Sequence, residues 1–152
     1  MNRRCTPADS EAMEALGARL ARGFTPGIVY LHGDLGTGKT TLARGLLRGL
    51  GHQGKVRSPT YTLVEPYQLA AGTVYHLDLY RLGSAEELEW LGLRDMLAEG
   101  ALLLVEWPER GAGVLPAADL TVHIDYRADG GRRVSLTAVS AAGERLLSEV
   151  KL

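Results

Sequence analysis

Hydrophobic positions in this chain follow two spacings, one typical of helices and one typical of strands. Met13, Leu16, Leu20 and Phe24 recur every three or four residues, which predicts a helix with one apolar face. Residues 6–9 place a hydroxyl, a proline and an acid before it, in the order of a helix start. We therefore expect the first helix to start at this segment, with a capping hydroxyl and the proline at its first position.

Two uninterrupted apolar runs predict buried strands. The first covers residues 28–31 of a predicted strand at 28–32, and a helix-like segment follows at 40–50. The second covers residues 102–105 of the predicted strand segment 102–107 and is closed by Glu106. A continuous apolar run closed by an acid is typical of a parallel strand whose tip faces a functional site.

Alternation, turn residues and capping signals assign the rest of the chain. They predict a strand-like stretch at 62–64, a hairpin through 70–72 into a strand-like segment at 74–81, short helices opening at Ser84 and at 93–98, strands at 120–124 and 134–139 joined through 129–131, and a last short strand or helix at 146–150. The predicted fold is a single α/β domain over residues 1–152. It has three layers, with a mixed, mainly parallel central sheet and a C-terminal β-hairpin.

The stretch between the first strand and the second helix fits the phosphate-binding pattern G-x-x-x-x-G-K-[ST]. Its glycines let successive N–H groups point inward, and the following helix adds its positive end. Lys39 has the reach to touch β- and γ-phosphates, and the Thr40 hydroxyl can ligate a magnesium ion. The residues expected to contact a nucleotide are Gly33, Asp34, Leu35, Gly36, Thr37, Gly38, Lys39, Thr40 and Thr41.

This phosphate-binding loop (P-loop) supplies only Thr40 toward a metal, so an acid must come from a neighbouring strand. Glu106 follows four apolar residues, as the Walker B acid does, and we favour it as the metal ligand. Asp78, which follows residues 74–77, is the alternative and would otherwise orient a water or bind in the metal's outer shell. Lys39, Asp78 and Glu106 are the candidate catalytic residues.

Several neighbouring residues carry two interpretations each. His76 either hydrogen-bonds within the site or is a strand histidine satisfied by backbone, and Trp107 either stacks on a base or partner or fills the core. Arg81 either touches phosphate or neutralises Asp78. Ser58 and Thr60 either sense the γ-phosphate or form an ordinary polar turn.

Composition limits the possible partners. The 152 residues are 45% apolar and 23% charged, and the net charge is −1, so no global positive field draws the chain to nucleic acid or membrane. Any contact with RNA is expected to be local or indirect. Cys5 is the only cysteine, which excludes an intrachain disulfide framework. No segment approaches the ~20 apolar residues of a membrane span, and we expect a cytoplasmic protein.

Three function classes compete at this point. A GTPase would carry an N/T-K-x-D element and a D-x-x-G switch, and neither occurs in the sequence, so ATP is favoured. A small-molecule kinase needs an arginine-bearing lid, for which Arg110 with Gly111 and Gly113 is the only candidate. The third class is a nucleotide-gated binding module, in which hydrolysis resets a protein complex.

Four motifs taken together resemble the TsaE family, the ATPase of bacterial tRNA threonylcarbamoyladenosine biosynthesis. They are Gly-Asp-Leu-Gly-Thr-Gly-Lys-Thr-Thr at 33–41, Ser-Pro-Thr-Tyr-Thr-Leu at 58–63, His-x-Asp-x-Tyr-Arg at 76–81 and Val-Glu-Trp-Pro-Glu-Arg-Gly at 105–111. The first motif is shared by many ATPases, whereas all four in this order are specific. The resemblance extends from about residue 8 to residue 138.

The resemblance implies a small P-loop protein that binds ATP and Mg²⁺, hydrolyses ATP slowly and joins the TsaB–TsaD pair. In that system TsaD transfers threonylcarbamoyl to adenosine 37 of tRNA, so this chain would meet tRNA only indirectly. Thr40 and Glu106 match the metal ligands, and Asp78 and Trp107 match two other required positions. The family's adenine site corresponds weakly to Ser10 and Gly130.

Thr37 occupies a position where the family usually has alanine. The backbone makes the contact at that position, so we expect this change to be harmless.

Overall fold

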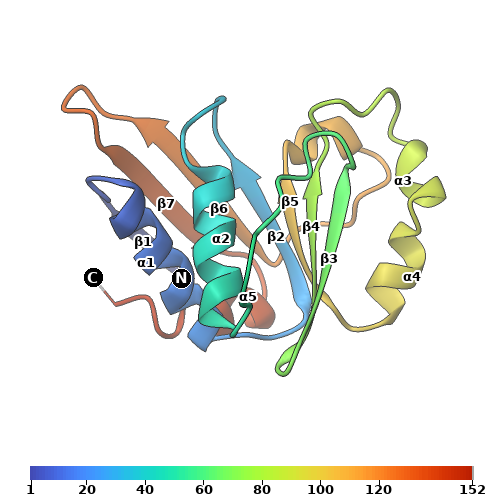
Figure 1. The fold of residues 1–152 in the computed structure, drawn as a ribbon, viewed down its shortest axis with the longest axis horizontal. Coiled ribbons are helices and arrows are strands. Elements are labelled where there is room, and N and C mark those ends of the chain that lie inside the picture. Colours follow the sequence, from blue (N-terminus) through green and yellow to red (C-terminus); the bar gives the residue numbers. More distant parts are fainter. Residues whose placement is uncertain (152) are drawn as a thin grey trace.

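The computed structural model describes residues 1–151, and its strands form one mixed sheet (Figure 1). Across this part of the chain the strands are β1 (Asn2–Cys5), β2 (Gly27–His32), β3 (Val64–Leu69), β4 (Gly72–Asp78), β5 (Leu102–Glu106), β6 (Leu120–Tyr126) and β7 (Arg132–Ala138). Their spatial order is β1-β7-β6-β2-β5-β4-β3. Strands β6, β2, β5 and β4 run parallel to one another, whereas β3 and β7 run antiparallel to their neighbours.

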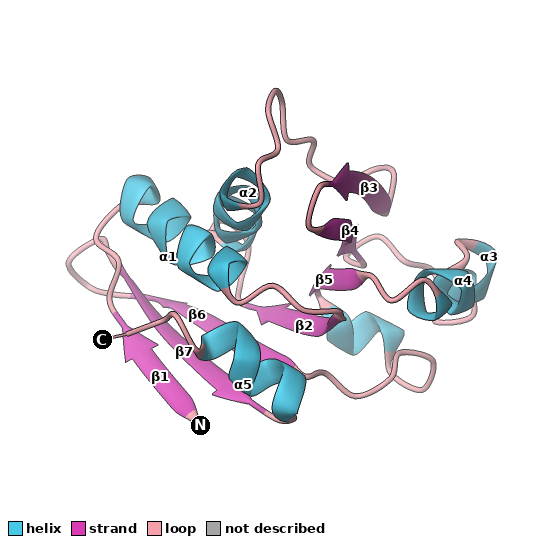
Figure 2. Ribbon diagram, turned by 90° about the horizontal axis from the view of Figure 1, so that it is seen from below, coloured by secondary structure: helices cyan, strands magenta, loops and turns pink. Residues whose placement is uncertain are grey.

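Helices cover this sheet from both sides. They are α1 (Ser10–Arg22), α2 (Lys39–Gly49), α3 (Glu87–Trp90), α4 (Leu93–Ala98), the 3-10 helix η1 (Pro108–Gly111) and α5 (Ala141–Leu147). Figure 2 shows α1 and α2 together on one side of the sheet, with α3 and α4 beyond β4 and β5 on the other side. Within residues 1–151, no helix combines the length and apolarity that spanning a bilayer requires.

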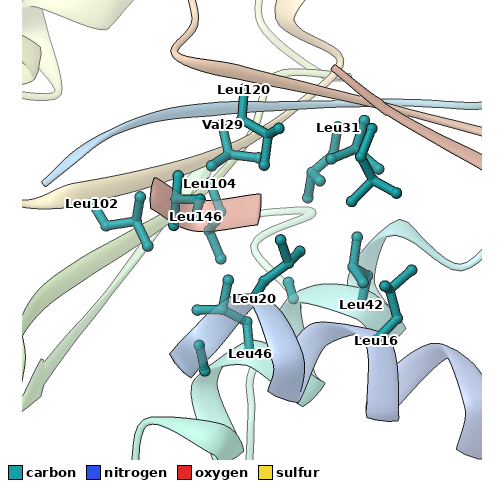
Figure 3. Close-up of a cluster of buried hydrophobic side chains, with 14 of the residues drawn as sticks. Leu16, Leu20, Val29, Leu31, Leu42, Leu46, Leu102, Leu104, Leu120 and Leu146 are labelled. Atoms are coloured by element: carbon teal, nitrogen blue, oxygen red, sulfur yellow. The ribbon is translucent and has the colours of Figure 1, made fainter. Parts of the chain in front are cut away.

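Alternate residues of the central strands point into two separate cores. Val29 of β2 and Leu104 of β5 belong to the larger core, with Leu20 of α1 and Leu46 of α2 (Figure 3). Their strand neighbours contribute to a smaller core under α3 and α4, as Leu103 does. Because both faces of β2 and β5 are buried, these strands read as continuous apolar runs in the sequence.

Helices α1 and α2 pack with their backbones in contact, which brings the start of α1 close to the P-loop. A Cβ atom on Gly17 would lie 2.3 Å from the carbonyl oxygen of Leu42, and one on Gly45 would lie 2.1 Å from that of Glu14. Only glycine permits this approach. As a result, the first turn of α1 forms a wall next to the P-loop.

The predicted fold class is confirmed, including the C-terminal hairpin, but the predicted start of the first helix is wrong. Asp9, rather than Thr6, is the N-cap: its carboxylate accepts the N–H of Ala12 at 2.9 Å. Pro7 lies before the helix, and its carbonyl accepts the backbone N–H of Arg132. The hairpin tip holds this segment extended, and that long-range contact decides where α1 begins.

Strand β1 was not predicted. It is a four-residue edge strand that pairs antiparallel with β7, and its residues alternate between exposed and half-buried. Such a strand depends on its partner, so local patterning gives little signal for it. The segment at 146–150, left open as strand or helix, falls at the end of α5, which Ser140 caps through the N–H of Gly143.

Two predicted strand boundaries also move. Leu63 has a left-handed backbone (φ 68°), so β3 begins at Val64 rather than at residue 62 and residues 62–63 stay outside it. Strand β4 ends at Asp78 rather than at residue 81, because the Asp78 carboxylate accepts the N–H of Tyr80 at 3.0 Å and closes a turn. The predicted helix start at Ser84 is wrong, because α3 begins at Glu87 and has no side-chain N-cap bond. Only one half of the predicted capping box forms: the Glu87 carboxylate accepts the N–H of Ser84 at 3.2 Å.

Candidate functional site

The P-loop runs from the end of β2 to the first turn of α2 with a backbone that only glycine accepts easily. Gly36 and Gly38 have φ values of 76° and 116°. A Cβ on Gly33 would lie 2.6 Å from the Thr37 hydroxyl and 2.8 Å from the carbonyl of Ile124. The loop is therefore tightly curled against β6, in the form that directs backbone N–H groups toward an anion.

Lys39 is folded back into this loop. Its ammonium group donates to the carbonyl of Gly33 at 2.5 Å and lies 3.6 Å from the centre of the Trp107 ring. Burial lowers the pKa of the Lys39 amine, while the nearby carboxylates of Glu106 and Asp78 oppose that shift. The amine therefore lies inside the site, where a phosphate group would replace the carbonyl as its partner.

Glu106 joins the P-loop to the neighbouring strand. The Thr40 hydroxyl donates to Glu106 Oε2 at 3.0 Å, and His76 Nε2 lies 2.6 Å from the same oxygen. Because a carboxylate only accepts hydrogen bonds, His76 Nε2 is the donor. Of the two interpretations of His76, the structure supports a hydrogen bond within the site.

Asp78 lies beside Glu106, since the two residues are register partners at the tips of β4 and β5. Both side chains are buried, with Asp78 6% and Glu106 3% exposed. Burial is the main cause that raises the pKa of the Asp78 carboxyl, and the Glu106 charge adds to it, whereas the N–H of Tyr80 opposes it. Neither acid is a solvent-facing side chain.

Two adjoining cavities meet at the P-loop and share Gly36, Gly38 and Thr41. The first, about 230 Å³, is lined by Leu35, Gly36, Gly38, Lys39, Thr40, Thr41, Thr60, Asp78, Tyr80, Glu106 and Trp107. The second, about 350 Å³, is lined by Ala8, Asp9, Ser10, Met13, Gly36, Thr37, Gly38, Thr41, Gly130 and Arg132. One cavity thus holds the carboxylates, while the other holds Ser10 and Gly130.

The P-loop residues predicted to contact a nucleotide mostly line these cavities. Gly33 and Asp34 are not in either lining as described over residues 1–151. The Gly33 carbonyl instead accepts a hydrogen bond from the Lys39 ammonium group, and the Asp34 carbonyl accepts one from the Thr37 hydroxyl at 2.9 Å. Both residues therefore shape the loop.

Trp107 has a left-handed backbone conformation, with φ 57°, directly after the Glu106 strand tip. Its ring packs 5.0 Å from the Tyr80 ring, covers Lys39 and also contacts the smaller core. A non-glycine residue in this region is strained, and such strain collects at functional sites. The side chain both lines the first cavity and packs, so the two interpretations of Trp107 are not exclusive.

The remaining predicted residues lie at the rim. Arg81 is exposed and stacks on the Tyr61 ring at 4.6 Å, and the ion pairs found within residues 1–151 include none between it and Asp78. Thr60 lines the first cavity, and its hydroxyl lies 2.8 Å from that of Ser58. Arg110, the lid candidate, lies in η1 with its guanidinium 5.5 Å from the Tyr80 ring.

Two residues that the sequence did not reveal contact the P-loop from the late hairpin. Arg132 donates to the carbonyls of Thr37 and Gly36, and the Tyr126 hydroxyl donates to the carbonyl of Leu35. These contacts join residues more than 90 positions apart. Spacing along the chain gives no signal for them.

The residues at the strand tips fit a magnesium ion bound together with phosphate. Within the described residues 1–151, no cluster of three or more His, Cys, Asp or Glu side chains could hold a metal by itself. Mg²⁺ commonly uses one or two protein oxygens and takes the rest from water and phosphate. The Thr40 and Glu106 oxygens are 3.0 Å apart, which matches the ~3 Å between adjacent ligands of an octahedral ion with ~2.1 Å bonds.

Comparison with known proteins decides the family. A family model described as threonylcarbamoyl adenosine biosynthesis protein TsaE matches residues 7–134. This chain belongs to the TsaE family. The TsaE of Haemophilus influenzae is 54% identical over 121 residues, covering 80% of this chain and 76% of its own. The TsaE of Bacillus subtilis is 36% identical over 149 residues, covering 97% and 91%.

A solved structure extends the likeness to the fold. The crystal structure of Bacillus subtilis YdiB aligns with a TM-score of 0.82 and 29% sequence identity, covering 99% of this chain and 94% of that one. The resemblance inferred from the four motifs is therefore confirmed. The TsaE model covers the P-loop, both acidic strand tips and most of the late hairpin.

Proposed function

We propose that this TsaE-family chain binds and hydrolyses ATP with Mg²⁺ in tRNA N6-threonylcarbamoyladenosine biosynthesis. Its hydrolysis would cycle the TsaB–TsaD complex, and the chain would not itself transfer the threonylcarbamoyl group. One observation carries the proposal: Lys39 and Thr40 of the P-loop meet two buried carboxylates, Asp78 and Glu106, at neighbouring strand tips. A structural P-loop would not need buried acids beside it.

Each side chain has a defined task in this mechanism. Lys39 exchanges the Gly33 carbonyl for β- and γ-phosphate oxygens, and the N–H groups of the P-loop bind the same phosphates. Thr40 and Glu106 would hold a magnesium ion, which would supply positive charge to neutralise the phosphates. Asp78, which its raised pKa makes a better proton acceptor than an ordinary aspartate, orients the attacking water.

The second cavity is the proposed site of the adenine and ribose. Ser10 and Gly130 both line it, and the family resemblance implies the same two residues for the adenine. It adjoins the first cavity at Gly36, Gly38 and Thr41, so one nucleotide can span both. The phosphates then reach Lys39 while the base stays next to the start of α1.

The decisive experiment is multiple-turnover tRNA modification with purified TsaB–TsaD, tRNA and the activated threonylcarbamoyl donor. The wild-type chain is expected to sustain repeated turnovers with ATP, whereas Glu106→Ala and Lys39→Ala stop after the first. If tRNA modification continues at the wild-type rate with both variants, ATP hydrolysis by this chain is not needed for repeated turnover.

A small-molecule kinase is the competing assignment, and phosphate release separates the two. We expect slow phosphate release from ATP without any metabolite, accelerated by TsaB–TsaD. A strict dependence on a metabolite acceptor would favour the kinase. The lid that a kinase requires has weak support here, because Gly111 is buried and a Cβ on it would meet the Leu88 and Leu115 side chains below 3 Å.

A further inference from the structure

The guanidinium of Arg132 is held by four carbonyl groups from two segments of the chain. Its Nε donates to Thr37 O at 2.9 Å and its Nη2 to Gly36 O at 3.3 Å, both in the P-loop. Its Nη1 donates to Gly130 O at 2.8 Å and Gly131 O at 3.1 Å in the hairpin turn. Four of the five N–H groups of the side chain are therefore used on backbone carbonyls.

Tyr126 completes this set of contacts from the other strand of the hairpin. Its hydroxyl donates to the carbonyl of Leu35 at 2.5 Å, and its ring lies 4.6 Å from the Arg132 guanidinium. The two side chains together bind three successive P-loop carbonyls, those of Leu35, Gly36 and Thr37.

The direction of these carbonyls fixes the direction of the amides. In a trans peptide the C=O of one residue and the N–H of the next point in opposite directions. Holding the carbonyls of Leu35 and Thr37 toward the hairpin therefore turns the N–H groups of Gly36 and Gly38 away from it. Both glycines line the two cavities, where a polyphosphate would meet those N–H groups.

We infer that Arg132 and Tyr126 are positioning residues that hold the P-loop amides in their phosphate-binding orientation before the nucleotide arrives. This inference rests on the proposed nucleotide binding and adds a role for the late hairpin in it. Because the carbonyls are already fixed, the P-loop N–H groups do not have to reorient when the phosphates bind. This preorganisation increases the affinity for the nucleotide. Arg132 acts through the loop and is not assigned a contact with the reacting atoms.

Arginine is the side chain that suits this task. Its planar fork presents several N–H groups in fixed directions, whereas a lysine ammonium is a compact charge on a flexible stem. The backbone N–H of Arg132 also donates to Pro7 O at 3.0 Å, which ties the segment before α1 to the same point. The residue thus connects the P-loop, the hairpin turn and the start of α1, which are the three walls of the second cavity.

Calorimetric titration with ADP and Mg²⁺ tests the inference in four variants of the full chain. Arg132→Met removes the guanidinium group, Arg132→Lys keeps a positive charge without the planar guanidinium, and Tyr126→Phe removes only the hydroxyl. Arg133→Met is the matched control, because Arg133 is the next residue along β7 and is exposed. We expect a 10- to 100-fold loss of ADP affinity for both Arg132 variants, a smaller loss of up to about 10-fold for Tyr126→Phe, and none for Arg133→Met.

A purely structural role is separated from positioning by the nucleotide-free protein. In amide NMR spectra of Arg132→Lys and Tyr126→Phe, the Gly36 and Gly38 signals should move while those of the sheet stay in place. Should Arg132→Met fail to fold, these two milder variants decide the question.

Two results would overturn the inference: wild-type affinity in both Arg132→Lys and Tyr126→Phe, or full recovery by lysine of an affinity that methionine loses. If the wild-type chain itself binds no ADP, the proposed function fails instead.

Discussion

Glu106 and His76 form a buried pair in which the imidazole Nε2 lies 2.6 Å from the carboxylate that also accepts the Thr40 hydroxyl. His76 is fully buried, and within residues 1–151 its Nδ1 is the one buried side-chain nitrogen or oxygen without a hydrogen-bond partner. Among residues 1–151, Glu106 is therefore the hydrogen-bond partner of the imidazole. We interpret His76 as the residue that orients the proposed metal ligand.

This orientation predicts different outcomes for two amide substitutions. His76→Gln can place an N–H near the position of Nε2, whereas His76→Asn is too short to reach Glu106. We expect His76→Asn to raise the Mg²⁺ concentration for half-maximal ATP hydrolysis by about 10-fold or more, the usual cost of losing a residue that orients a metal ligand. His76→Gln should stay near wild type. Equal Mg²⁺ dependence in the two variants would show that the bond to Glu106 has no such role.

We expect the ionised Asp78 side chain to lower the stability of the folded protein. Burial raises its pKa, so the folded protein binds a proton more tightly than the unfolded chain does, and the ionised side chain destabilises the fold above the ordinary aspartate pKa. Asp78→Asn is therefore expected to raise the melting temperature of the nucleotide-free protein by a few degrees at pH 7.5 while abolishing ATP hydrolysis. The gain should shrink as the pH falls toward 4, because Asp78 then becomes protonated in the folded protein. Thermal unfolding across this pH range measures the gain in melting temperature. An Asp78→Asn variant that melts at a lower temperature than the wild-type chain at pH 7.5 would contradict the prediction.

Trp107 should report nucleotide binding, and the chain supplies its own control. Trp107 covers the Lys39 amine at 3.6 Å, whereas Trp90 on α3 is 90% exposed and lines neither cavity. Because Lys39 must change partners when phosphate binds, the environment of the Trp107 ring changes with it. We expect ADP to alter tryptophan fluorescence in Trp90→Phe and to leave Trp107→Phe almost unchanged. A fluorescence change in Trp107→Phe but not in Trp90→Phe would mean that the phosphates do not enter the first cavity.

Much of the fold was accessible from sequence because its central strands are buried on both faces. Residues 28–31 and 102–105 are apolar without interruption for that reason, and the glycines at 33, 36 and 38 mark the turn between strand and helix. The acids at 78 and 106 were found because parallel strands bring their carboxyl ends to one edge of the sheet.

The errors lie where distant contacts override local signals. The hairpin holds Pro7 and so moves the helix start to Asp9, and the edge strand β1 exists only by pairing with β7. Arg132 was not predicted as a site residue for the same reason. Its contacts with the P-loop span about 95 positions, so no spacing in the sequence indicates them. Sequence patterns thus located the residues at strand tips but missed those that brace the loop from another element.

The central claim is that the P-loop binds the phosphates of ATP through Lys39, and isothermal titration calorimetry with Mg²⁺–ATP tests it most directly. We expect saturable, one-to-one binding to the wild-type chain and an affinity about 10- to 100-fold weaker for Lys39→Met, which keeps the length of the side chain and removes its charge. No heat of association with the folded wild-type protein at millimolar ATP, or equal affinity in Lys39→Met, would contradict the account.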